Sequence, residues 1–181
     1  MEKTMDKIGW KAQWRIDKFK DPDATIAKGL QAGMPVQEAM SRYAQAFICT
    51  EEFEANIALN EGLQELIDII CGLGTPTEWD NSNARLGVGD SNAAENASQT
   101  GLQAATNKAY KVMDATYPQR TNQTAEWRAT FGTDEANFAW EEYTVVNAAD
   151  DSGDNLNRKT ASKGTKSSGE TWTLSLKVTF S

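Results

Sequence analysis

Paired carboxylates are the residues of this sequence best suited to acid–base chemistry. Glu51 and Glu52 form one adjacent pair, and Glu141 and Glu142 form another. A glycoside hydrolase holds two carboxylates about 5–10 Å apart across a sugar cleft, and adjacent residues of a strand point to opposite faces. Histidine is absent from the 181 residues, which excludes His-based triads and the most common general base. We therefore expect no enzymatic activity and no cofactor.

Two other patterns have the composition of ligand-binding loops. The run Gly87-Val88-Gly89-Asp90-Ser91 lacks the lysine of a phosphate-binding loop, so we interpret it as a tight strand-to-loop turn. Oxygen-bearing side chains also cluster in two stretches, but neither has the spacing of a calcium-binding loop. We interpret both as solvated turns, with a loop calcium as the alternative: Asp80, Asn81, Asn83 and Asp90, and then Asp150, Asp151 and Asp154.

The charge balance bears on the class of partner. The chain has 26 acidic and 18 basic residues and a net charge of −8, which disfavours nucleic acid and anionic membranes as partners. No apolar run reaches the roughly 20 residues of a membrane span, and residues 1–10 lack a signal-peptide core. Cys49 and Cys71 cannot form a thiolate zinc site alone. We expect buried free thiols of a reducing compartment, with a single disulfide as the alternative.

Alternating apolar and polar residues predict a mainly β protein. Residues 8–16 alternate, and the charged stretch 17–23 is expected to end that strand. Further runs with strand composition are 85–88, 109–113, 125–131, 138–146, 156–160 and 172–180, with a possible bulge near residues 141–142. Short strands at this spacing indicate an antiparallel β-sandwich or jelly roll.

Helical spacing predicts one or two short helices. Within residues 24–47, Pro35 suits a first helical turn and is followed by apolar residues at helical spacing. The segment Asn60 to Cys71 has an apolar stripe, Asn60 as a candidate N-cap and Gly72 as a stop. We expect this helix to cover one end or edge of the sandwich. The predicted organisation is an N-terminal strand, arm and helical insertion over residues 1–53, and a helix-capped β-sandwich domain over 54–181.

Aromatic and basic residues are the candidates for binding. The six tryptophans are expected in the core or a subunit interface, with a carbohydrate-binding platform as the alternative. A basic stripe beside two of them suits either a solvated strand face or an arm that docks onto an acidic partner. The candidate partner-binding residues are Trp10, Lys11, Trp14, Arg15, Lys18 and Lys20.

Three ordered blocks carry a resemblance to a known group of proteins. They run from Asn81 to Asp114, from Trp127 to Tyr143 and from Leu156 to Phe180. Together they resemble small tailed-bacteriophage virion structural proteins, variously labelled as head decoration (cement) or tail proteins. The resemblance covers roughly residues 54–181 and the first strand, whereas residues 21–52 depart from it. It implies a β-sandwich virion component, and it carries no catalytic positions.

The resemblance implies a head decoration protein as the first functional expectation. Such a protein would form a homotrimer, bind the major capsid protein on the capsid exterior and stabilise the shell, after assembly in the host cytoplasm. A tail, neck or fibre-tip protein that contacts a receptor is the alternative. A carbohydrate-binding module is the second alternative.

Overall fold

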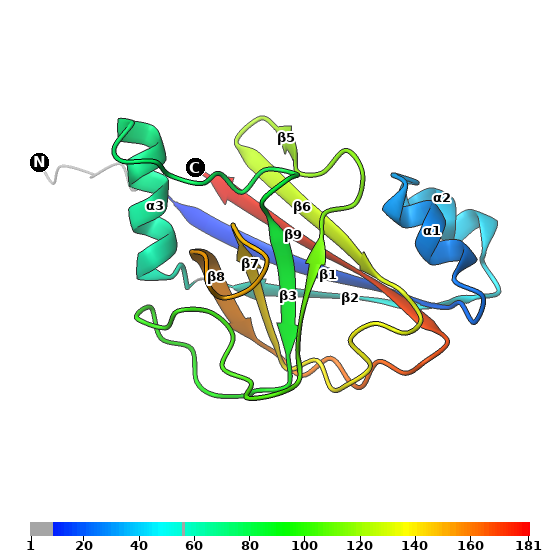
Figure 1. Ribbon diagram of the computed structural model, residues 1–181. Coiled ribbons are helices and arrows are strands. Elements are labelled where there is room, and N and C mark those ends of the chain that lie inside the picture. The colour runs from blue at the N-terminus through cyan, green and yellow to red at the C-terminus, as the bar shows by residue number, and fades with distance from the viewer. Residues whose placement is uncertain (1–8, 56) are drawn as a thin grey trace, which may run out of the picture.

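Two antiparallel sheets pack face to face in the computed structural model, which describes residues 9–55 and 57–181 (Figure 1). Sheet A has the strand order β2 (Phe47–Ala55), β1 (Trp10–Lys20), β9 (Glu170–Phe180), β6 (Thr124–Phe131) and β5 (Gln119–Thr121). Sheet B has the order β4 (Lys108–Val112), β3 (Arg85–Gly89), β7 (Glu142–Val146) and β8 (Asn155–Thr160). The predicted β-sandwich is confirmed, although the sequence had not indicated β5.

The core lies between the two sheets and is rich in aromatic rings. Alternate residues of the central strands, such as Trp14 on β1 and Leu174 on β9, are almost fully buried there. Trp140 is completely buried, and its ring centroid lies 4.9 Å from that of Phe131 and 4.8 Å from that of Trp172. Such edge-to-face contacts add to the stabilisation that apolar burial provides.

Strand β1 continues to Lys20, into the charged stretch 17–23 that was expected to end it. Its polar residues find partners across the sheet. The Asp17 carboxylate accepts hydrogen bonds from Arg15 and from Thr50 on β2. Phe19 is buried in a second, smaller apolar cluster. Charged residues therefore do not end this strand, because Arg15 and Thr50 provide hydrogen bonds to the Asp17 carboxylate.

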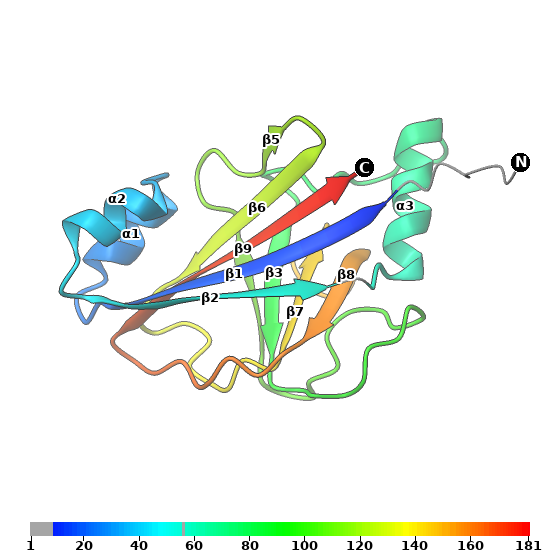
Figure 2. The same ribbon diagram turned by 180° about the vertical axis from the view of Figure 1, so that it is seen from behind.

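Two short helices, α1 (Thr25–Gln31) and α2 (Val36–Arg42), occupy the stretch in which one helix was predicted. They pack on Phe19 through Ile26, Leu30 and Ala39 and form the small cluster at one end of sheet A (Figure 2). The chain then returns as β2, which pairs with β1. The boundary between the two predicted units, at residue 53, consequently falls within a strand of sheet A.

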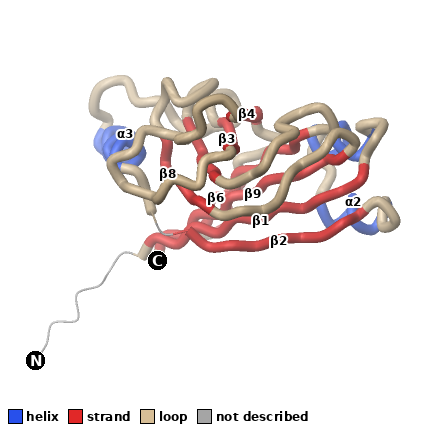
Figure 3. The backbone as a smooth tube through the Cα atoms, turned by 90° about the horizontal axis from the view of Figure 1, so that it is seen from below, coloured by secondary structure: helices blue, strands red, loops and turns tan. Residues whose placement is uncertain are grey.

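Helix α3 (Asn60–Cys71) has the bounds that the sequence predicted and lies at the opposite end of the sandwich from α1 and α2 (Figure 3). Leu59 precedes the helix, so Asn60 is its first residue and not the predicted cap. Gly62 packs directly on the backbone of Asn155 and Leu156. None of the described helices is long and apolar enough to cross a membrane.

The contact at Gly62 gives a prediction with a clear sign. A Cβ at this position would lie 2.5 Å from both the carbonyl oxygen of Asn155 and the Cα of Leu156. In an unobstructed helix, replacing glycine with alanine stabilises by roughly 1 kcal/mol. We expect Gly62→Ala instead to lower the free energy of unfolding by about 1–3 kcal/mol, because backbone atoms must shift. Urea denaturation measures this, and an increase in stability would contradict the contact.

The two cysteines differ from the expectation of buried thiols. Both are free, with Cys49 half-buried on β2 and Cys71 exposed at the end of α3. For Cys71 the cause is local, because it lies beside Ile67 and Ile70 on the exposed flank of α3.

Candidate functional site

The predicted partner-binding residues on β1 divide between the two faces of sheet A. Lys11, Arg15 and Lys20 are at least partly exposed, whereas Trp14 is in the core. Trp10 packs edge-on against Phe180, with ring centroids 5.4 Å apart. The structure therefore brings two of the six, Lys11 and Arg15, together on the outer face of the sheet.

Lys11 and Arg15 are paired with glutamates of the neighbouring strand β2. Lys11 lies 2.8 Å from the Glu54 carboxylate, and Arg15 lies 3.3 Å from that of Glu52. Exposed pairs of this kind contribute at most about 1 kcal/mol each to stability. The basic stripe is consequently balanced by the chain's own glutamates on the neighbouring strand.

Lys18 differs from the other predicted binding residues because it is a buried cation that pairs with a carboxylate. Its ammonium group donates to Glu51 and to the carbonyl oxygen of Lys163, and it sits 3.9 Å from the ring centroid of Trp172. Although burial works in the opposite direction, the neighbouring Lys18 ammonium holds the pKa of Glu51 below its usual value. Lys18 therefore ties β1 to β2 and to the 161–169 loop.

A shallow depression of about 370 Å³ lies on the outer face of sheet A. It is lined by two aromatic residues, Trp14 and Phe53, and by six polar or charged residues: Gln13, Arg15, Glu52, Glu54, Ser175 and Lys177. Sites for small organic ligands are usually concave and mostly apolar, with only a few polar groups. Most of the residues that line this depression are polar or charged, so it does not resemble such a site.

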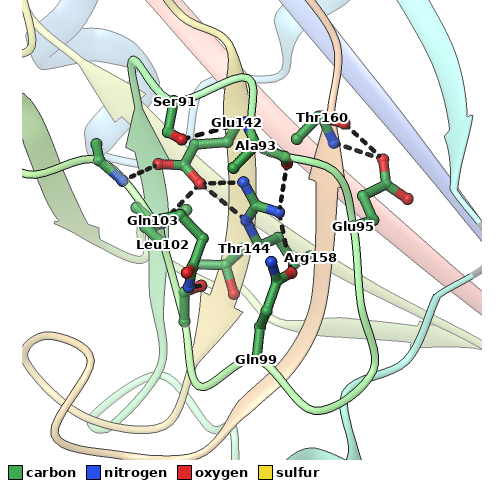
Figure 4. Close-up of polar contacts among 12 residues, drawn as sticks. Ser91, Ala93, Glu95, Gln99, Leu102, Gln103, Glu142, Thr144, Arg158 and Thr160 are labelled. Atoms are coloured by element: carbon green, nitrogen blue, oxygen red, sulfur yellow. Dashed lines mark hydrogen bonds and ion pairs between the residues drawn. The ribbon is translucent and has the colours of Figure 1, made fainter.

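A buried ion pair links the outer face of sheet B to the long loop that covers it (Figure 4). Glu142 on β7 and Arg158 on β8 are both completely buried. The Glu142 carboxylate accepts hydrogen bonds from Arg158 Nε at 2.8 Å and from the backbone N–H groups of Gln103 and Ala104 at 2.8 and 2.7 Å. The pair therefore compensates its burial with hydrogen bonds.

The covering loop, residues 90–107, is fastened along its length. Arg158 also donates to the carbonyl oxygen of Ala93 and to the side chain of Gln99. The Glu95 carboxylate accepts hydrogen bonds from both the backbone and the hydroxyl of Thr160. Burial opposes the effect, but these hydrogen bonds hold the pKa of Glu95 below its usual value. The chemistry of this cluster is that of a structural fastening.

Gly87 and Gly89 leave room for side chains that pack on β3. A side chain at Gly87 would meet the ring of Tyr110, and one at Gly89 would meet the Glu142 carboxylate. Gly87 and Gly89 belong to β3, and the loop begins after them. Residues 87–89 are therefore the end of a strand and not the tight turn that was expected, and the chain leaves the strand after Gly89.

The two oxygen-rich stretches act as turns within the described part of the chain. Asp80 accepts hydrogen bonds from the backbone of Ser82 and Asn83, and Asp150 accepts one from Ser152. Asp151 pairs with Lys108 at 3.0 Å. Among the described residues, no group of three or more acidic or thiol side chains is placed to hold a metal ion.

The tryptophans do not form an exposed platform. Trp14, Trp79, Trp127, Trp140 and Trp172 are all at least 93% buried, and Trp10 is partly covered by Phe180. All six lie in the part of the chain that the structure describes. Sugar stacking needs exposed ring faces, so these residues favour the interpretation as core.

Lys166 is a buried cation that sequence reasoning missed. Its ammonium group donates to the carbonyl oxygen of Gly132 at 2.7 Å and to the side chain of Asn137 at 2.8 Å. It thereby joins the loop before β7 to the loop after β8. Burial lowers the pKa of Lys166 to about 8.

This shift predicts a rise of stability with pH. Unfolded lysine titrates near pH 10.4, so between about pH 8 and 10.4 the unfolded chain binds more protons than the folded one. Relative to Lys166→Met, the wild-type free energy of unfolding should rise by about 1–3 kcal/mol over that interval. Denaturation at several pH values measures the difference. The same substitution at exposed Lys28 should leave the slope unchanged, and equal slopes for both variants would contradict the assignment.

One flank of α3 is the apolar surface of the described chain that has no partner within it. Leu63, Ile67 and Ile70 are 39%, 55% and 75% exposed, and Leu73 just beyond the helix is 54% exposed. The stripe that the sequence predicted exists, but it faces away from the sandwich.

Comparison of the chain with protein-family models, with curated proteins and with solved structures finds no match.

Proposed function

We propose that the protein is a bacteriophage virion structural protein, and specifically a head decoration protein that binds and stabilises the assembled capsid shell. The proposal starts from the resemblance of three sequence blocks to small virion proteins. It assigns the chain a binding role on the capsid exterior, with the major capsid protein as the partner. A homotrimer would match the threefold axes of an icosahedral shell.

The observation that supports this proposal is the way in which the three blocks meet. The first block contributes the N–H groups of Gln103 and Ala104, the second contributes Glu142 and the third contributes Arg158. The residues that carry the resemblance thus build one fastened structural unit. A rigid domain with a sealed face suits a protein whose task is to hold other subunits in place.

Mass action gives the proposed role its physical basis. A protein that binds the assembled shell, and not the dissociated subunits, stabilises the assembled form. Capsids that lack the protein should consequently break at a lower temperature than capsids that carry it. Adding purified protein back should restore the higher breakage temperature.

The deciding measurement is the copy number of the protein relative to the major capsid protein in purified virions of the source phage. A ratio near one, or a simple fraction of it, is the expected result. A copy number typical of a single vertex or tail would favour the alternative of a tail, neck or fibre-tip protein. Absence from purified virions would refute both structural roles.

A further inference from the structure

The loop before β7, residues 132–141, and the loop after β8, residues 161–169, run side by side at one end of the sandwich (Figure 2). Their backbones are hydrogen-bonded to each other. The N–H group of Trp140 donates to the carbonyl oxygen of Gly164 at 2.9 Å, and that of Lys166 donates to the carbonyl oxygen of Phe138 at 3.1 Å. The two loops are therefore held in a fixed alignment.

The side chain of Lys166 is a buried amine that has only neutral acceptors. The residue is 1% exposed, and its Nζ donates to the carbonyl oxygen of Gly132 and to Oδ1 of Asn137. Burial lowers its pKa to about 8, although more distant carboxylates oppose the effect, namely those of Glu170, Glu135 and Asp134. A large share of folded chains near pH 8 consequently carries a neutral amine here, and a neutral amine is a nucleophile.

The carboxamide of Asn137 is presented to this amine by two hydrogen bonds. Its Oδ1 lies 2.8 Å from Nζ of Lys166, and its Nδ2 donates to the carbonyl oxygen of Thr133 at 3.0 Å. These contacts fix the plane of the amide and leave its carbonyl carbon next to the amine. Asn137 is exposed, so water reaches the same group. The pair thus combines a buried nucleophile with an acyl group that solvent can reach.

We propose that Lys166 and Asn137 form an intramolecular isopeptide bond, which joins the loop before β7 to the loop after β8. The lone pair of Nζ attacks Cγ of Asn137, the Nζ–Cγ bond forms and the Cγ–Nδ2 bond breaks. One amine proton passes through water to the departing nitrogen, which leaves as ammonia. The reaction consumes no oxidant and no other reactant.

The fixed geometry is what allows this slow reaction to proceed. Reacting groups that are held in the right orientation reach effective concentrations of about 10⁵–10⁸ M. The aligned loops provide that orientation, and the resulting tie suits a head or a tail protein alike. The pH dependence predicted above for Lys166 belongs to chains in which the bond has not formed, because an amide nitrogen does not titrate in that range.

The test is the mass of the purified full chain, measured under denaturing conditions after several days at a pH above the pKa of Lys166. We expect chains that are lighter than the sequence by the mass of one ammonia molecule. Trypsin should release a branched peptide that joins residues 129–158 to residues 164–177, because it no longer cleaves after Lys166. The full mass in every chain would overturn the proposal.

Three variants assign the loss of ammonia to this pair. Lys166→Met and Asn137→Ala should keep the full mass under the same treatment, and circular dichroism verifies that each is folded. Asn107→Ala, at another exposed asparagine, should still lose ammonia. A lighter chain whose digest contains no branched peptide would overturn the proposal, because a succinimide formed by a single asparagine gives the same change of mass. A loss of ammonia that persists in Asn137→Ala would overturn it as well.

Discussion

Arg158→Met should lower the free energy of unfolding by about 3–5 kcal/mol and loosen the loop that covers sheet B. The substitution leaves the Glu142 carboxylate completely buried with no cation beside it. It also removes the donors to Ala93 and Gln99. Chemical denaturation measures the loss, and amide hydrogen exchange at Gln103 and Ala104 reports the loop directly.

A double-mutant cycle provides the control for this prediction. Glu142→Gln alone should also destabilise, because an amide cannot accept hydrogen bonds at both of its terminal atoms. The double variant should cost less than the two single variants together, by about 1–3 kcal/mol, because neither member then leaves a lone buried charge. Additive losses would mean that the two residues act independently, against the geometry of the pair.

Trp140→Ala should destabilise the sandwich by about 3–5 kcal/mol, because a large cavity opens where both sheets meet. The ring is completely buried between Phe131 and Trp172, and its Nε1 donates to the carbonyl oxygen of Ala136 at 3.0 Å. For a chain of this size, the loss corresponds to a fall in Tm of about 6–20 °C. Calorimetry or thermal circular dichroism measures it.

Two further variants test whether the effect belongs to this position. Trp140→Phe keeps an aromatic ring and should cost clearly less than Trp140→Ala. Trp10→Ala removes a half-buried ring at the end of sheet A, and it should cost less than either. A similar loss of stability at Trp10 and Trp140 would contradict the prediction, because the contacts of the fully buried Trp140 ring would then not account for the effect.

Local pattern was enough to predict most strands. The alternation around Trp14 and around Leu174 reflects residues that do face the core, because a strand with one buried face must alternate. The three-residue strand β5 has no such signal, since none of Gln119, Arg120 and Thr121 is apolar or buried. Its position follows from pairing with β6, which only the folded chain defines.

For helix α3, the spacing of apolar residues predicted the span of the helix but not its orientation on the sandwich. Its span was predicted from the spacing of Leu63, Ile67 and Ile70, but spacing does not say which flank meets the sandwich. That choice depends on Gly62, a weak helix former by type, which packs directly on the backbone of β8. A glycine on one flank of an otherwise regular helix is the signal that could have indicated close packing there.

The candidate site residues depended on register, which a single sequence does not contain. Lys11 and Arg15 were interpreted either as part of a solvated strand face or as part of an arm that docks onto an acidic partner, and each lies beside a glutamate of β2. Likewise, Glu142 and Arg158 become a pair only because β7 and β8 are neighbours in sheet B. Charged residues on different strands can be matched only when the strand order is known.

The central position of β9 in sheet A has a consequence for biosynthesis. β9 lies between β1 and β6, yet it follows every other strand of the described chain in order of synthesis. Until it emerges from the ribosome, β1 and β6 have no common neighbour, and the rings of Trp14 and Trp127 lack their cover from Leu176. Sheet A can therefore be completed only after the last strand has been synthesised, and the edges of β1 and β6 stay unpaired on that side until then.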